Sequence, residues 1–143
     1  MVAATVGWAF EYVTLKQHPR YTNLWGYVQY SRPLETRADL DLWAPTFLAG
    51  QFGETALLGF AGPGASQDTT MVLNQIRAFI LSGDEQRVFF HAAFQRAQEI
   101  TRDRQLAVRA VASALLGEQT LQSRRAHDVI ELATINERGL EPR

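Results

Sequence analysis

Apolar residues recur at helical spacing through the last two thirds of the chain. In "QDTTMVLNQIRAFILSG" they fall at Met71, Val72, Ile76, Phe79 and Ile80. A stripe of this kind buries one face of a helix against its neighbours. In "DEQRVFFHAAFQRAQEITRD" the stripe contains Val88, Phe89, Ala92, Ala93, Ala97 and Ile100. The segments "RQLAVRAVASALLGEQTL" and "RRAHDVIELATINERG" repeat the pattern, so we predict successive helices that pack as a bundle.

The first third of the chain has a different pattern. The segments "FEYVTL" (10–15) and "LWGYVQY" (24–30) are rich in β-branched and aromatic residues, and Pro19 and Asn23 lie between them as turn signals. This arrangement is typical of a β-hairpin with a long loop. Before it, "MVAATVG" resembles the last turns of a helix that Gly7 stops. So short a helix is held by packing, or it begins further upstream.

A helix with a proline follows the hairpin. In "DLDLWAPTFLAGQFGETALLG" (39–59) the apolar residues have helical spacing, but Pro45 lacks the N–H that a helix interior needs. The helix therefore either kinks at Pro45 or begins there. We expect the longer, kinked helix.

Length and composition favour one domain. The chain has 143 residues, 46% of them hydrophobic, which suits one core. We predict a single α+β domain, mostly α-helical, with a small N-terminal β-hairpin or sheet in residues 1–35 and four to five helices in residues 36–143. A formal net charge of -1 argues against nucleic acid as a partner. There is no apolar run of the roughly 20 residues that cross a bilayer. The lack of cysteine excludes disulfides and fits the cytoplasm, where we expect the protein.

The glycine-rich turn in "FAGPGASQDTTMVL" (60–73) permits three interpretations. A phosphate cradle is excluded, because the turn has no G-x-x-x-x-G-K-[ST] pattern and follows no convincing strand. Ser66 or Asp68 can cap the following helix. Asp68 can also ligate a metal. The three histidines lie far apart in the sequence, so their spacing does not indicate a metal site.

Several segments, in order along the chain, resemble motifs of one peptidase family. "EYVTL" and "WGYVQYS" correspond to a strand, a turn and a Gly-Tyr pair, and "LAGQFGE" (48–54) to a helix of the form L-x-G-R-A-A-E. "GASQD" (64–68) corresponds to T-G-A-x-x-D, and residues 97–121 to a tail that ends L-L-E-x-x-T-L. The chain thus resembles the peptidase domain of the FtsH-type AAA zinc metalloproteases. Its length leaves no room for an ATPase module.

The resemblance implies a zinc site. The family holds zinc with the two histidines of H-E-x-x-H and an aspartate that opens a later helix, and the motif glutamate activates a metal-bound water. Asp68 corresponds to that aspartate. The H-E-x-x-H segment would lie directly before the chain's first residues. The resemblance therefore implies that the chain as given holds no catalytic residue, does not bind zinc by itself and does not hydrolyse peptides.

Other residues receive weaker assignments from the resemblance. Glu54 lies near the metal without touching it, or else serves on the helix surface or as a cap. Gln67 helps to orient the carboxylate of Asp68. Gly26, Tyr27 and Val28 correspond to the family's active-site strand, to which a substrate peptide adds as an extra strand. The alternative for these three residues is an ordinary strand of the sheet.

Two functions remain open from the sequence. The first is a zinc metallopeptidase-like domain, with peptide or protein substrates. The second is a pseudo-peptidase without catalysis that acts as a binding or assembly module. The family suggests a homo-oligomeric ring and a separate ATPase partner.

Overall fold

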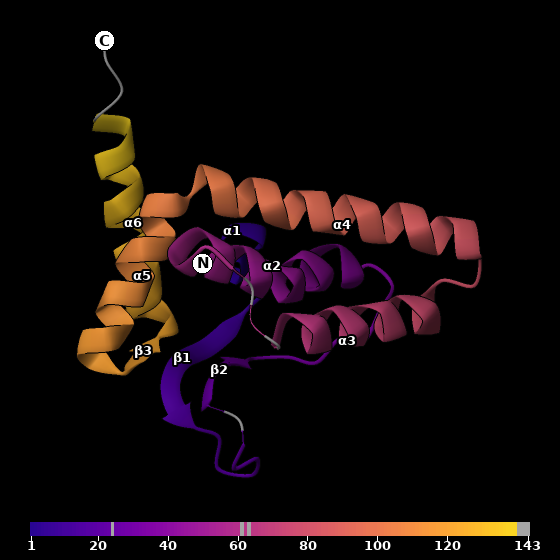
Figure 1. Ribbon diagram of the computed structural model, residues 1–143, viewed down its shortest axis with the longest axis horizontal. Coiled ribbons are helices and arrows are strands. Elements are labelled where there is room, and N and C mark those ends of the chain that lie inside the picture. Colours follow the sequence, from indigo (N-terminus) through magenta and orange to yellow (C-terminus); the bar gives the residue numbers. More distant parts are fainter. Residues whose placement is uncertain (24, 61, 63, 140–143) are drawn as a thin grey trace. The chain divides into compact units, whose positions relative to one another are not determined.

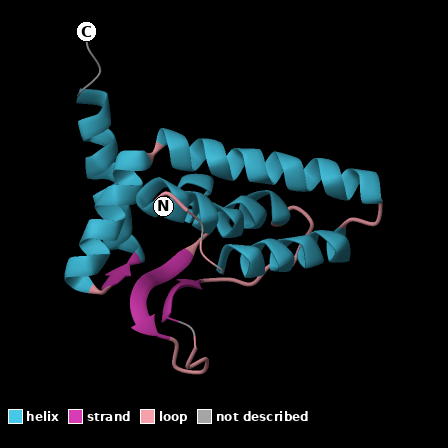
Figure 2. Ribbon diagram, in the orientation of Figure 1, coloured by secondary structure: helices cyan, strands magenta, loops and turns pink. Residues whose placement is uncertain are grey.

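The computed structural model describes residues 1–23, 25–60, 62 and 64–139, and it confirms the predicted α+β, mostly helical fold. Figure 1 labels the elements, and Figure 2 separates helices from strands. Leu24, which we expected in the second strand, lies outside the described residues. The helices and strands, in order, are α1 (Val2–Val6), β1 (Phe10–Gln17), β2 (Trp25–Tyr30), α2 (Leu40–Leu58), α3 (Gly64–Phe79), α4 (Gly83–Asp103), α5 (Gln105–Glu118), β3 (Thr120–Gln122) and α6 (Ser123–Gly139).

The chain divides into two compact units, and each combines segments that are distant in sequence. The first unit contains Ala9–Pro33 and the segment from Arg104 onward, with the three strands, α5 and α6. The second unit contains Val2–Trp8 and Leu34–Asp103, with α1 to α4. That both units belong to one domain stays a prediction.

Helix α2 is the centre of the second unit. It contacts α1, α3 and α4, and most residues of its first half are buried. Its buried residues are Leu40, Trp43, Ala44, Pro45, Thr46 and Leu48. Past Leu48 the burial falls, and Leu58 at the end of the helix is 62% exposed. The first half of α2 therefore holds the unit together, and the second half is available to carry polar groups.

Pro45 lies inside α2, so the prediction of the longer helix is confirmed. The helix starts at Leu40 and passes through Pro45, whose ring is buried in the core. The following residue, Thr46, donates its hydroxyl to the carbonyl of Leu42 at 2.8 Å. The kink that we expected at Pro45 stays a prediction. The helix ends at Gly59, which has the left-handed φ of 83° that favours glycine.

The short helix α1 is held by packing. Val2, Ala3 and Val6 are buried, and the helix contacts α2 and α4. Gly7 ends it, as predicted, with a φ of 82°, and the N–H of Trp8 donates to the carbonyl of Ala3 at 2.9 Å. Contacts with longer helices thus offset the cost of forming so short a helix.

Helices α3 and α4 complete the second unit, with two differences from the predicted stripe. Val72, Ile76 and Ile80 are buried as expected, and so are Ala93 and Ala97. Val88, however, is 71% exposed, and Ala92 is exposed too. The side of α4 that packs is centred on alanines, which let a neighbouring backbone come close, and Val88 lies outside this contact. Among the described residues, no helix combines the length and the apolar character of a membrane span.

The first unit contains an antiparallel sheet with the strand order β2-β1-β3. The predicted hairpin is confirmed, because β1 pairs with β2, with Val13 opposite Val28 and Thr14 opposite Tyr27. Strand β3 was not predicted. It pairs with the other edge of β1 and places Leu121, which is fully buried, opposite Val13. Helices α5 and α6 pack on each other and on this sheet.

Thr14 joins β1 to β3 through its side chain. The residue is 3% exposed, and its hydroxyl lies 2.7 Å from that of Thr120. It also donates to the carbonyl of Gln119 at 3.1 Å. Gln119 ends α5 with a φ of 60°, a conformation that costs a residue with a side chain roughly 1–2 kcal/mol. Hydrogen bonds from β1 help to hold this strained turn in place.

We predict that Thr14→Val lowers the free energy of unfolding by about 1–2 kcal/mol, because it removes the hydrogen bonds that the buried hydroxyl makes with Thr120 and with the carbonyl of Gln119. Urea denaturation followed by circular dichroism measures the change. Thr70→Val is the matched control, since the exposed Thr70 only donates to the carbonyl of Ser66 within α3, and it should change stability by a few tenths of a kcal/mol at most. Equal losses in the two variants would contradict the prediction.

Candidate functional site

The residues assigned to peptide binding lie on the edge strand of the sheet. Because the order is β2-β1-β3, one edge of β2 pairs with β1 and no other strand among the described residues pairs with its second edge. Gly26, Tyr27 and Val28 are all partly exposed. An open strand edge presents N–H and C=O groups to which an extended peptide can bind.

Gly26 gives this strand its local geometry. Its φ is 72°, in the left-handed region, and a Cβ atom there would lie 3.6 Å from the carbonyl oxygen of Thr14 on β1. The register between β1 and β2 shifts between Thr14 and Gln17, next to this residue. The pairing of β2 with β1 is therefore irregular at Gly26, regular from Tyr27 to Gln29 and shifted again before Tyr30.

Tyr27 is held by other aromatic residues. Its hydroxyl lies 3.1 Å from that of Tyr12, and the two rings meet edge to face at 5.9 Å. The His18 ring lies 4.7 Å from the Tyr27 ring, and His18 Nδ1 accepts hydrogen bonds from the N–H groups of Arg20 and Tyr21. The hydrogen bond with Tyr12 raises the pKa of Tyr27 above its usual range. These contacts join Tyr27 to β1 and to His18 in the described part of the loop before β2.

Asp68 and Glu54 bring two carboxylates together in the second unit. Asp68 lies near the start of α3 and Glu54 in the second half of α2, and both are partly exposed. Desolvation, and then the negative charge of Glu54, raise the pKa of Asp68 above its ordinary value of 3.8. A Cβ atom added to Gly50 on α2 would lie 3.4 Å from Asp68 Oδ2. The carboxylate thus approaches the α2 backbone where a glycine leaves room for it.

Glu54 also holds the connection between α2 and α3. Its Oε2 accepts a hydrogen bond from the N–H of Gly62 at 2.5 Å. One turn earlier on α2, Gln51 Nε2 is buried and has no hydrogen-bond partner among the described residues. The negatively charged Glu54 and the unsatisfied amide of Gln51 therefore lie one turn apart on α2.

The other polar residues of this region take the following positions. Helix α3 begins at Gly64, so Ser66 and Asp68 lie inside its first two turns and not at the N-cap. Gln67 is exposed, and in the part of the chain that the structure describes it makes no hydrogen bond to Asp68. Its role in orienting the carboxylate stays a prediction.

The residues present do not complete a zinc site. Across residues 1–23, 25–60, 62 and 64–139, no group of three His, Cys, Asp or Glu side chains could hold a metal ion. His18 belongs to the loop between β1 and β2, His91 is exposed on α4, and His127 stacks on Phe10 at 5.5 Å. Asp68 with Glu54 offers carboxylates only, whereas a catalytic zinc site needs three protein ligands, commonly with histidines.

The two parts of the candidate site belong to different units, β2 to the first and the carboxylate pair to the second. Each part is defined by contacts within its own unit. In comparisons with known proteins, neither a protein-family model nor a curated protein matches the chain.

Sequence reasoning missed three groups at these places. The Glu54–Gly62 hydrogen bond and the orphan amide of Gln51 depend on how α2 and the following loop pack, which no short motif encodes. The Tyr12–Tyr27 contact carried a signal, because the two tyrosines fall on neighbouring strands of the predicted hairpin. A register for that hairpin would have placed them near each other.

We predict that Asp68→Asn stabilises the protein at neutral pH by on the order of 0.5 kcal/mol, a value discounted because the group is partly exposed. The pKa of Asp68 is higher in the folded state than in the unfolded state, so the protonated carboxyl stabilises the fold at pH values below the unfolded-state pKa. This stabilisation is lost as the pH rises through the folded-state pKa. At neutral pH the ionised group is therefore a cost, and the variant removes it. Thermal unfolding at pH 7 and near pH 3.5 measures the change, which should disappear at the lower pH.

The matched test repeats Asp68→Asn in a Glu54→Gln background. Because the charge of Glu54 contributes to the raised pKa of Asp68, the stabilisation should shrink in the double variant. An unchanged gain there would show that Glu54 does not act on Asp68.

Proposed function

We propose that the chain is an FtsH-type peptidase-like domain that binds an extended peptide along β2. The open edge of β2 supports this proposal most directly. Gly26, Tyr27 and Val28 lie there, with Tyr27 fixed by its contact with Tyr12. Peptide binding through main-chain hydrogen bonds at such an edge accepts many sequences, as a peptidase with protein substrates requires.

The parent activity in this proposal is zinc-dependent peptide hydrolysis, with Asp68 as one zinc ligand. Two observations support the assignment: the carboxylate is partly desolvated, and a second carboxylate lies beside it, so a cation would be favourable at this point. The 143 residues contain no H-E-x-x-H. The chain as given would therefore bind peptide without cleaving it.

The alternative, a pseudo-peptidase that serves as an assembly module, is favoured by one feature of α6. Leu132 and Ile135, one turn apart, are 60% and 58% exposed. An apolar helix face of this kind suits a contact with another protein. A homo-oligomer or a separate ATPase would be its partner, and the cytoplasm its location.

We predict that the chain as given shows no tight zinc binding by calorimetry. Placing His-Glu-Ala-Ala-His directly before Val2 should create tight one-to-one binding, because in the family that the chain resembles two imidazoles one helical turn apart join the aspartate that corresponds to Asp68. In the extended chain, Asp68→Ala should abolish the tight binding. Asp41→Ala, which removes an exposed carboxylate from α2, is the control and should leave binding unchanged.

Two results would count against the zinc assignment. Tight zinc binding by the chain as given, lost in Asp68→Ala, would show that the site is already complete. Zinc binding by the extended chain that survives Asp68→Ala would show that Asp68 is not a ligand.

We predict that an extended peptide of alternating threonine and valine residues, flanked by lysines, slows amide hydrogen exchange at Tyr27 and Val28. The added strand would hydrogen-bond to the open edge of β2. Exchange followed by NMR, residue by residue, measures the protection. Amides of Val13 and Leu121, on strands β1 and β3, are the controls and should change little. Protection confined to the helices would rule out strand addition.

A further inference from the structure

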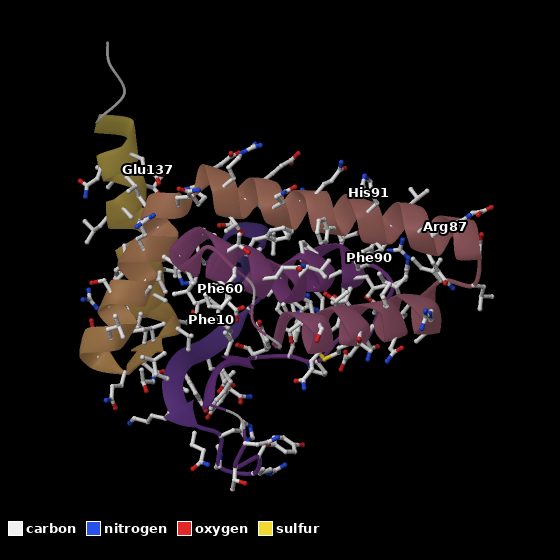
Figure 3. The ribbon with its side chains drawn as sticks, viewed as in Figure 1. Phe10, Phe60, Arg87, Phe90, His91 and Glu137 are labelled. Atoms are coloured by element: carbon white, nitrogen blue, oxygen red, sulfur yellow. The ribbon has the colours of Figure 1, made fainter. Side chains whose placement is uncertain are left out.

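A groove runs between α3 and α4 in the second unit, apart from both proposed sites. It has a volume of about 430 Å³, within the range of ligand-binding sites in proteins. Leu73 of α3 and Phe90 of α4 contribute apolar surface to it, and the buried Ile76 lies beneath them. In Figure 3, Phe90 lies on the side of α4 that faces α3.

Packing inside the unit holds the apolar residues of the groove in place. Ile76 is 1% exposed, so it belongs to the core of the unit. The Phe90 ring lies 6.0 Å from that of Phe94, which meets Phe52 of α2 edge to face at 4.9 Å. Phe90 is thus anchored to α2 through a second aromatic ring. Its surface in the groove is a fixed platform for an apolar side chain.

The polar part of the groove is basic. Arg77 lies on α3, and Arg87 and His91 lie one turn apart on α4. None of the described residues that line the groove is acidic. The chain as a whole has 15 acidic residues and 14 lysines and arginines, so the lining of the groove is more basic than the chain on average.

Both arginines can bind a further anion. Arg87 pairs with Asp84 in an exposed contact, and such contacts contribute little, so a carboxylate from a partner can compete for the guanidinium. Arg77 is exposed and meets Asn74, an uncharged amide, at 3.5 Å. The two guanidinium groups belong to different helices, one on either side of the apolar floor.

We propose that this groove docks an acidic segment of a partner protein, with an apolar side chain against Phe90 and Leu73 and carboxylates at Arg77 and Arg87. Charge complementarity selects this occupant. The groove between α2 and α4 has no such selectivity, because Asp41 and Arg96 both line it. The proposal does not depend on the proposed function, since it uses neither β2 nor Asp68.

The test is a fluorescence-polarisation titration of the full chain with a labelled peptide, Glu-Asp-Glu-Leu-Phe-Glu-Asp-Glu. We expect saturable binding that weakens as salt is added. Arg77→Glu and Arg87→Glu should each weaken it about tenfold, because each turns an attraction into a repulsion. Arg109→Glu is the matched control: it makes the same charge change at an exposed position on α5 and should weaken binding less than twofold.

Replacing the Leu-Phe pair of the peptide with Ser-Ser should weaken binding about tenfold as well, since the apolar floor would lose its contact. The three protein variants change exposed charges, and the fourth change is in the peptide. Circular dichroism of the protein variants should therefore show an unchanged fold.

Three outcomes would overturn the proposal. The first is no saturable binding of the peptide. The second is an equal loss in Arg109→Glu and in the groove variants, which would indicate general attraction to the chain. The third is binding to phosphatidylserine vesicles but not to the peptide, which would assign the groove to lipid headgroups.

Discussion

The burial of the first half of α2 is the constraint on which the second unit depends. Leu40 and Ala44 are fully buried and Leu48 nearly so, at positions four residues apart that share one helix face. Helices α1, α3 and α4 all contact this helix. Even Pro45, which weakens the backbone hydrogen bonding of a helix, is accommodated because its ring fills space in the core. The neighbours of α2 thus receive their positions from one helix.

The polar features of the unit follow from the same helix. Burial along α2 falls after Leu48, and its second half places Glu54 against the connection to α3, where it accepts a hydrogen bond from Gly62. The packing of α3 then desolvates Asp68 and exposes it to the charge of Glu54, and both effects raise its pKa. The two carboxylates repel each other, and partial exposure to water keeps this cost small. A site of this kind combines a rigid support with a modest electrostatic strain.

The sequence predicts the long elements better than it predicts how they meet. Val72, Ile76 and Ala97 lie in the core as their spacing indicates, because helical periodicity is local. Strand β3 has three residues, too few for a pattern, and its partner Thr14 is more than 100 residues away. For the candidate site, the sequence supplies Asp68 and Gly26 as candidates. Glu54 was a candidate as well, but its hydrogen bond with Gly62 and the approach of Thr14 to Gly26 come from packing across elements, which no single segment encodes.

The position of β3 affects how the chain can reach its folded state. β1 and β2 are close in sequence and can pair early. The second edge of β1 stays unpaired until β3, residues 120–122, is added. Closing that loop has an entropic cost, and contacts between distant residues slow folding. During synthesis, β1 would emerge long before its second partner. The hairpin would then have both edges open while the four helices of the other unit form, a period in which a chaperone or another strand can reach it.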